Sequence, residues 1–251
     1  MNRRIISLLL SLIMITGMLA GCASSGSEVT SPEPAVVAAP FDGSEYVSMS
    51  ELTDAAEDVE AAAASFGPVN NYDSKLSVPT YITKIDDLWF IVDCYHNRVI
   101  YSDELGKPLN EWLIMCDKAY YPHTIASDGK VYLVDDTENN RVLIYEKAGG
   151  KFVHTQTVYD IGVRPHFSVY DEASDTFYVW GSESGQLYCF RHTPDSNRIY
   201  LTDVREVEQL KGIYVRSFTI VGGEIWFVAG VSPTGAKPEI LICDLETLSV
   251  K

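Results

Sequence analysis

Two segments of this 251-residue chain, which begin 43 positions apart, are near copies of one another. They read Asp93-Cys-Tyr-His-Asn-Arg98-Val-Ile and Asp136-Thr-Glu-Asn-Asn-Arg141-Val-Leu, and each follows an apolar, aromatic run with the character of a β-strand. A repeat of about 40–50 residues that contains strands and no helices is typical of four-stranded sheets arranged radially. The repeat therefore predicts an all-β fold of similar sheets that pack side by side.

Four aromatic residues at matching strand positions set the spacing of the repeats. Trp89, Tyr132, Tyr178 and Trp226 are separated by 43, 46 and 48 residues. Glycine, asparagine and aspartate lie between the strands, and they close tight hairpins because they tolerate positive φ. We therefore predict a β-propeller domain over residues 68–251, with about four recognisable blades. In the second repeat the predicted strands are His123–Ser127, Lys130–Asp135, Arg141–Glu146 and Lys151–Tyr159.

The fourth repeat raises the question of how the propeller is completed. The third repeat again offers four strands, at Phe167–Tyr170, Thr176–Gly181, Gln186–Arg191 and Arg198–Val204. The fourth offers three, at Arg216–Val221, Glu224–Ala229 and Glu239–Asp244. An unfinished blade leaves an open sheet edge. Residues 69–77 or 45–48 could supply the missing strand, the chain could be a truncated relative of a larger propeller, or two chains could complete each other. We expect an incomplete propeller, or one that the N-terminal segment closes irregularly.

The segment from Val131 to Phe152 resembles the NHL repeat, in which a strand ending in Tyr-Val-Ala-Asp leads through an Asn-x-Arg turn into a second strand. Trp89 to Leu109 matches almost as well, whereas Ser182-Glu-Ser-Gly185 replaces the turn in the third repeat and a long loop replaces it in the fourth. The resemblance implies a propeller, usually of six blades. Its known functions include protein and RNA recognition, sensor ectodomains, and a few lyases and lactonases. The fold alone does not choose among them.

The first 21 residues have the pattern of a signal peptide. Two arginines precede an apolar run over residues 5–15, which is too short to span a bilayer comfortably. The run leads to Leu19-Ala20-Gly21-Cys22, which resembles the bacterial lipoprotein box. The resemblance implies cleavage of residues 1–21, a diacylglycerol on the sulfur of Cys22 and a third acyl chain on its amino group, with palmitate as the expected acyl group. An ordinary secretory signal is the alternative.

Two or more acyl chains would hold the mature protein durably at a membrane surface, so we expect a lipid-anchored protein that faces outside the cytoplasm. Ala23 stands where an aspartate commonly signals inner-membrane retention, which permits the outer membrane in a cell with two membranes. Residues 22–47 are rich in Ser, Glu, Pro and Ala and predict a disordered tether. Ser48-Met-Ser-Glu51 is a capping box that predicts an amphipathic helix over residues 48–67. Its polar face is acidic, so we expect it to pack against the domain.

The charge balance argues against nucleic acid as a partner. The chain contains 19 basic and 35 acidic residues, which gives a formal net charge of −16. Removal of residues 1–21 makes it −18, because that segment contains two arginines and no acid. Such an acidic body repels phosphate backbones and anionic lipids. It is compatible with cationic ligands, with metal ions or simply with solubility.

Four cysteines remain besides the lipidation candidate: Cys94, Cys116, Cys189 and Cys243. None of them shows the C-x-x-C spacing of a metal site. We expect mostly buried free thiols. A disulfide between Cys189 and Cys243, which occupy matching strand positions of adjacent repeats, is the alternative, although adjacent blades separate away from the axis.

The repeated pairs, Asp93 with Arg98 and Asp136 with Arg141, are interpreted as structural. Aspartate can cap a turn through its backbone amides, and arginine can donate to a nearby carboxylate or carbonyl oxygen. A single active site would not need two copies of the same pattern.

A different set of residues forms the candidate ligand site. His123 and His166 each follow a proline at the start of an innermost strand, and Thr80 and Arg216 hold the corresponding positions. Innermost strands line the central channel, so these four side chains should converge near one mouth. Two imidazoles there suit a metal or acid–base chemistry. Arg216 would repel a cation, however, so the set favours an anionic or polar ligand, and we expect no metal and no cofactor.

The leading hypothesis is a surface-anchored propeller that binds a protein, peptide or saccharide ligand and performs no chemistry. The sequence has no Gly-rich phosphate loop, no Gly-x-Ser-x-Gly and no His-Glu-x-x-His, so no complete catalytic set is evident. One alternative is an extracytoplasmic lyase or hydrolase that uses His123 and His166. The other is a truncated propeller without activity of its own.

Overall fold

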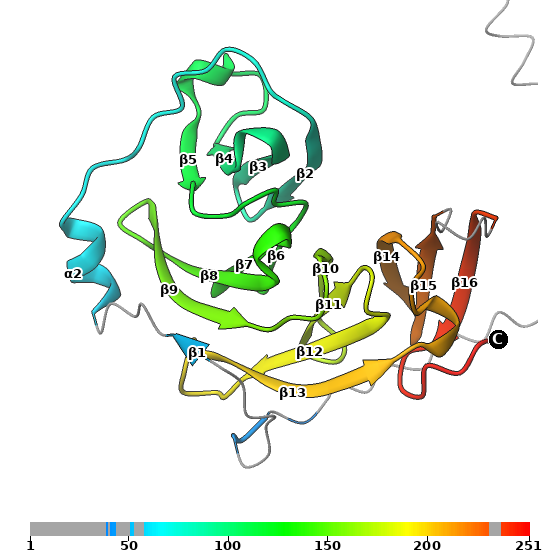
Figure 1. The fold of residues 1–251 in the computed structure, drawn as a ribbon. Coiled ribbons are helices and arrows are strands. Elements are labelled where there is room, and N and C mark those ends of the chain that lie inside the picture. The colour runs from blue at the N-terminus through cyan, green and yellow to red at the C-terminus, as the bar shows by residue number, and fades with distance from the viewer. Residues whose placement is uncertain (1–38, 40, 44–50, 53–57, 231–236) are drawn as a thin grey trace, which may run out of the picture. The chain divides into compact units, whose positions relative to one another are not determined.

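The computed structural model describes residues 39, 41–43, 51–52, 58–230 and 237–251, and their strands form four antiparallel sheets (Figure 1). The first sheet contains β2 Pro79–Ile85, β3 Leu88–Asp93, β4 Arg98–Ser102 and β5 Leu113–Cys116. The second contains β6 Ile125–Ser127, β7 Val131–Asp136, β8 Arg141–Ala148, β9 Lys151–Tyr159 and, beside β9, β1 Glu51–Leu52. The third contains β10 Pro165–Asp171, β11 Thr176–Gly181, β12 Gln186–His192 and β13 Ile199–Glu206. The fourth contains β14 Val215–Val221, β15 Glu224–Ala229 and β16 Glu239–Asp244.

The predicted all-β propeller with four blades is confirmed. Apart from β1, which pairs with β9, strands pair in sequence order within each sheet. The innermost strand of the third sheet, β10, contacts the innermost strands β6 and β14 of its neighbours. Strands β11, β15 and β16 have the predicted bounds, because each is a run of alternating or continuous apolar residues that ends at a turn. The turns use glycines with positive φ, such as Gly129 at 89° and Gly223 at 78°.

Apolar side chains from facing sheets fill the spaces between successive blades. Between the first and second sheets, the rings of Phe90, Tyr132 and Phe152 meet with centroids 4.8 to 5.7 Å apart. A similar cluster of buried aliphatic and aromatic residues lies between the second and third sheets. Between the third and fourth, Trp180 and Phe227 lie 4.6 Å apart. Burial of these faces is the main term that stabilises the blades against one another.

The helix predicted over residues 48–67 is shorter in the structure, where α2 spans Val59–Ala64. Its N-cap is Asp58, whose carboxylate accepts a hydrogen bond from the amide of Ala61 at 2.9 Å. The residues Glu51–Leu52 form β1, which pairs with the edge of β9. At these two residues the chain pairs with an open strand edge where the sequence predicted helix, and residues 48–50 and 53–57 lie outside the described ranges.

Most of the predicted N-terminal features lie outside the described residues, including the signal peptide 1–21, Cys22, Ser48 and most of the tether 22–47. The few described tether residues contact the third sheet. The carbonyl of Ala39 accepts a hydrogen bond from Arg191, and the ring of Phe41 lies 6.0 Å from that of Tyr200. Among the helices of the described ranges, none combines the length and apolar character that crossing a bilayer requires.

One hypothesis was that residues 69–77 supply the missing strand of the fourth blade. Instead, residues 69–71 pair with the first blade. Asn70 bridges Leu113, and the amide of Ile114 donates to the carbonyl of Val69 at 2.7 Å. Residues 45–48 lie outside the described ranges. In the fourth sheet, Val250 bridges Cys243, and the amide of the last residue donates to the carbonyl of Ile242 at 3.0 Å. The final residues therefore pair along β16, where a fourth strand would lie.

One face of the fourth sheet carries apolar side chains that remain accessible to solvent. Val228 and Ile240 are direct cross-strand partners on β15 and β16, and they are 47% and 62% exposed. On the opposite face of the same sheet, Phe218 and Phe227 are buried against the third sheet. In the strand period of two, apolar side chains therefore lie on both faces of this sheet, beside polar ones on the face of Val228 and Ile240.

The four cysteines in the described ranges, Cys94, Cys116, Cys189 and Cys243, are buried free thiols, as predicted. Burial raises the pKa of Cys94 and of Cys189 to about 12. These groups are neutral thiols at physiological pH, so they behave as small apolar side chains rather than as nucleophiles.

The two repeated Asp–Arg pairs form buried or half-buried ion pairs that hold the turns between strands. Nε and Nη2 of Arg98 donate to Oδ2 of Asp93 at 2.9 and 2.7 Å, and Oδ1 accepts from the amide of Ser77 at 2.6 Å. In the next blade, Nε of Arg141 donates to Oδ2 of Asp136 at 2.6 Å. Both carboxylates are fully buried. The interpretation of the pairs as scaffold therefore fits their geometry.

Replacement of Asp93 by alanine should lower the free energy of unfolding by about 3 kcal/mol. The substitution leaves the buried Arg98 guanidinium without its principal acceptor and frees a backbone amide. Urea unfolding followed by tryptophan fluorescence measures this loss. The matched control is Asp103→Ala, which removes a carboxylate from an exposed pair with Lys107 and should leave the midpoint unchanged. Equal midpoints for the two variants would contradict the structural interpretation of the motif.

Candidate functional site

Three of the predicted site residues occupy the same position, a β-bulge at the start of the first strand of a sheet. In the first sheet the pairing passes from Pro79↔Asp93 to Tyr81↔Val92, so Thr80 is an extra residue without a partner. His166 and Arg216 hold the same place in the third and fourth sheets. A bulge bends the strand locally and redirects the side chain of the extra residue. The repeated bulge therefore gives each blade one redirected side chain.

His123 reaches the equivalent position in the second sheet by a different route. It precedes β6, and the amides of His123 and Thr124 both donate to Oδ1 of Asp135 at 2.8 Å. Asp135 is fully buried, and burial raises its pKa to about 7. This carboxyl group holds the two backbone amides that precede the first strand pair of β6, Ile125↔Val134.

The structure brings the four predicted residues together in a continuous chain of contacts across the four blades. The hydroxyl of Thr80 donates to the carbonyl of His123 at 3.0 Å. The rings of His123 and His166 stack with centroids 3.7 Å apart and planes inclined by 18°. Nδ1 of His166 then contacts the carbonyl of Arg216 at 3.1 Å. We call Thr80, His123, His166 and Arg216 the axial cluster.

The residue before each of three prolines adds a second tier of side chains beside the axial cluster. Val78, Tyr121 and Arg164 have φ of 51°, 53° and 57°, in the left-handed region that costs most residues about 1 kcal/mol or more. Tyr214 holds the corresponding place before Val215. The repeated conformation gives the side chains of Val78, Tyr121 and Arg164 the same starting direction from the first three blades, and Tyr214 does not share the positive φ.

The turn motif of one blade holds the backbone of the next blade's second tier. Oδ1 of Asn97 accepts from the amide of Tyr121 at 3.0 Å, and Oδ1 of Asn140 accepts from the amide of Arg164 at 2.9 Å. A second contact between blades is repeated: the hydroxyl of Thr137 donates to the carbonyl of Pro165 at 2.7 Å, and that of Ser182 donates to the carbonyl of Val215 at 2.9 Å. The repeated turn motif therefore positions the candidate site without belonging to it.

Buried polar atoms of this region lack hydrogen-bond partners within the described residues: Nδ1 of His123, Nε2 of His166 and Nε of Arg164. A carbonyl only accepts, so the contact with Arg216 assigns the proton of His166 to Nδ1. Nε2 is then an acceptor with a free lone pair. Buried polar groups are rarely left unsatisfied, and an exception is a signal for a ligand or ordered water.

Both histidines are neutral at physiological pH. Burial lowers the pKa of His123 to about 3, with further lowering by the adjacent His166 and by Arg164 and Arg216. Burial likewise lowers the pKa of His166 to about 4, against the hydrogen bond to Arg216. Two stacked imidazoles that remain neutral can accept and donate hydrogen bonds without repelling one another.

The two arginines beside the histidines differ in how far they are neutralised. Arg164 pairs with Glu138 at 2.7 Å and, more loosely, with Glu183 at 3.6 Å. Arg216 is exposed, and in the described part of the chain no carboxylate lies within ion-pair distance of it. Its guanidinium lies 5.3 Å from the centroid of the Tyr214 ring, which also meets the His166 ring at 5.1 Å. Tyr214 therefore brings a cation and a neutral acceptor close to one another.

The cluster has no reactive thiolate, although Cys94 lies beside it. Sγ of Cys94 lies 4.0 Å from Nε2 of His123, but its raised pKa keeps the thiol protonated. Within the described ranges, no group of three or more His, Cys, Asp or Glu side chains is arranged to hold a metal ion. The arrangement can accept a hydrogen bond, donate several and hold a negative charge.

Sequence reasoning missed Arg164, Tyr121, Tyr214 and Asp135. A usable signal was present for Tyr121 and Arg164, because both directly precede prolines that mark innermost strands, whereas Tyr214 precedes Val215. The bulge geometry shows why the positions on either side of the proline matter. Asp135 carried no signal, since a second aspartate at the end of the strand occurs only in the second repeat.

The chain matches no protein-family model, and no curated protein matches it in sequence. Solved structures share the fold: a candidate 6-phosphogluconolactonase from Bacteroides uniformis has a TM-score of 0.56 at 11% identity and covers 71% of this chain. A second from Bacteroides fragilis gives 0.51 at 12% identity over 71% of the chain, and the periplasmic gluconolactonase of Pseudomonas aeruginosa gives 0.50 at 14% over 72%. The matched region spans 56–57% of the length of these structures. The similarity places this chain among β-propellers.

Stability should depend on pH through His166. Its pKa is about 4 in the folded protein and about 6.5 in the unfolded chain, so between these values only the unfolded chain is protonated. Stability from this group is therefore present above pH 6.5 and is lost as the pH falls towards 4. Between pH 7.5 and 5, the free energy of unfolding measured in urea should fall by about 1–2 kcal/mol more in the wild type than in His166→Gln, whose side chain at this position cannot titrate. Identical pH dependence in both proteins would contradict a neutral buried His166.

Proposed function

We propose that this protein is an extracytoplasmic, lipid-anchored propeller of the NHL-like kind that binds a small hydroxylated anion at the axial cluster. One observation carries the ligand class. Nε2 of His166 is a buried acceptor without a partner, and the exposed guanidinium of Arg216 lies against the same Tyr214 ring.

The imidazole and the guanidinium can each contact a different chemical group of one ligand. A hydroxyl can donate to the imidazole lone pair, and a carboxylate can accept paired hydrogen bonds from a guanidinium. A planar guanidinium suits carboxylate better than an ammonium does, because its donors lie in a fixed fork. Sugar acids and small hydroxy acids carry both groups. Among the expected ligand classes, this favours an acidic saccharide over a neutral one, which would leave the charge of Arg216 without a partner.

D-Gluconate should bind to the purified domain, and D-sorbitol should bind at least about tenfold more weakly. Both compounds have six carbon atoms and several hydroxyl groups, but sorbitol lacks the carboxylate. A charge-assisted hydrogen bond contributes about 1.5–3 kcal/mol, which corresponds to about one to two decades in affinity. Isothermal titration calorimetry measures both constants.

Variants locate the binding. Arg216→Gln should remove the preference for gluconate, and His166→Gln should weaken both compounds. Lys211→Gln, which removes an exposed cation directly after the 3-10 helix Glu208–Leu210, should change neither. Equal affinities for gluconate and sorbitol in the wild type would refute the proposed anion contact.

A catalytic function is the second candidate, and the free lone pair of His166 is the observation that favours it. A neutral imidazole can take a proton from a water molecule that attacks the carbonyl of a lactone, while the ring oxygen that leaves takes up a proton. The gluconolactonases that share the fold make D-glucono-δ-lactone a reasonable test compound. Hydrolysis above the spontaneous rate that disappears in His166→Gln but persists in Lys211→Gln would favour this candidate over binding alone.

The lipid anchor rests on the lipoprotein-like box that ends at Cys22 and on the apolar run before it. In a bacterial host that acylates lipoproteins, the wild-type chain should fractionate with membranes and incorporate labelled palmitate. Cys22→Ser removes the only sulfur that the box can acylate and should release the protein from the membrane fraction or leave its signal uncleaved without label. Label retained by Cys22→Ser would overturn the assignment.

A further inference from the structure

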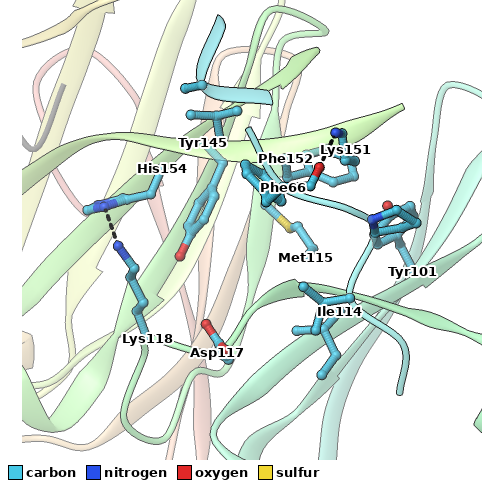
Figure 2. A pocket seen from close by; sticks show the side chains of 14 residues that line it. Phe66, Tyr101, Ile114, Met115, Asp117, Lys118, Tyr145, Lys151, Phe152 and His154 are labelled. Carbon is cyan, nitrogen blue, oxygen red and sulfur yellow. Dashed lines mark hydrogen bonds between the residues drawn. The ribbon is translucent and has the colours of Figure 1, made fainter. Parts of the chain in front are cut away.

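A pocket of about 360 Å³ lies between the first two blades, away from the axial cluster (Figure 2). Strands β5 and β9, the fourth strands of their sheets, form its sides, and α2 with the residues that follow it forms its roof. Blades of a propeller separate towards their outer strands, so such a space opens where side chains no longer interdigitate. Its volume is at the lower end of the range for small-molecule sites, about 300–1,000 Å³.

The body of the pocket is apolar. Phe66 from the roof, Ile114 and Met115 from β5, and Phe152 from β9 line it. Phe66 is 39% exposed, whereas Met115 and Phe152 are buried. An exposed aromatic ring above a buried apolar floor can contribute burial to a ligand that enters between them.

The roof is fixed rather than loosely laid over the blades. Nζ of Lys151 donates to the carbonyls of Ala63 and Phe66 at the C-terminal end of α2, and it lies 4.9 Å from the centroid of the Phe66 ring. A lysine at this end of a helix satisfies carbonyl groups that have no partner within the helix. The ammonium of Lys151 is therefore committed to the roof and not to a ligand.

The opposite end of the pocket is polar, and Lys118 there has hydrogen-bond donors that are not all used. Nζ of Lys118 donates to Nδ1 of His154 at 3.4 Å, and Nε2 of His154 contacts the hydroxyl of Thr157 at 2.9 Å. An ammonium carries three donors, so the exposed Lys118 can also donate to a ligand. The exposed Asp117 lines the same end and opposes part of this charge.

We propose that this pocket binds a small amphipathic anion, with its aromatic or aliphatic body between Phe66, Met115 and Phe152 and its acidic group on Lys118. The apolar lining favours a ligand with an aromatic or aliphatic body, and Lys118 favours a ligand with an acidic head group. The site is separate from the axial cluster and does not depend on the function proposed there.

Two fluorescent probes with the same aromatic body test both parts of the proposal. 1-Anilinonaphthalene-8-sulfonate carries an anionic head, and N-phenyl-1-naphthylamine has the same rings without it. Both should bind the full chain with saturable fluorescence, and Phe66→Ala should weaken both by about tenfold because apolar contact is lost. Tyr72→Ala, at an 83% exposed ring outside the pocket, is the matched control and should change neither.

Charge variants separate the head from the body. Lys118→Gln should weaken only the sulfonate probe, by about fivefold, and Asp117→Asn should strengthen only that probe. Lys130→Gln, at an exposed lysine in a hairpin turn, should affect neither. Thermal unfolding of each variant establishes that it is folded.

Two results would overturn the proposal. One is that Lys118→Gln weakens the binding of both probes equally, which would exclude a charge contact between Lys118 and the sulfonate. The other is loss of binding in Ile240→Ser, on the exposed face of the fourth sheet, together with unchanged binding in Phe66→Ala. That result would place the probes on the fourth sheet.

Discussion

The axial cluster depends on a hydrogen bond that crosses from one blade to the next. The side-chain oxygens of Asn97 and Asn140, each at the end of a turn, accept from the amides of Tyr121 and Arg164. These amides belong to residues with positive φ that directly precede a proline, a conformation that is unfavourable by itself. The acceptor from the neighbouring blade offsets that cost. The ion pair of Asp136 with Arg141 keeps the turn that carries Asn140 in place.

Solvation decides what the cluster can do once it is in position. His123 and His166 lie in a site that is dry enough to keep both rings neutral, while Arg216 reaches solvent. The cations beside the rings reinforce this, because they make protonation of either imidazole less favourable. The strongly acidic body of the protein would keep an anion away at long range, and water screens the exposed guanidinium, so its attraction for an anion would act only at short range.

The sequence predicted much of this arrangement because the repeat defines a register. Counting from the Asp…Arg turn located the innermost strands. Prolines then located Thr80, His123 and His166, and the strand offset located Arg216. The start of α2 was not predictable in the same way. The capping box at Ser48 is a local signal, whereas the pairing of Glu51–Leu52 with β9 depends on a strand about a hundred residues later. The pairing of residues 69–71 with β5 was missed for the same reason, since a short polar segment carries no information about which open edge it will meet. The pocket under α2 draws on three separate segments, and no local pattern marks it.

The second tier of the cluster has a consequence for how such a protein can change its ligand. At the four equivalent positions the chain has Val78, Tyr121, Arg164 and Tyr214, which are aliphatic, aromatic, cationic and aromatic. Where the acceptor from the previous blade is an asparagine, it accepts from the backbone amide and not from the side chain. The bond that holds the backbone and the group that the side chain presents thus involve different atoms of the same residue. A blade could therefore exchange this side chain and keep the backbone hydrogen bond, although at Arg164 the exchange would also remove the ion pairs with Glu138 and Glu183.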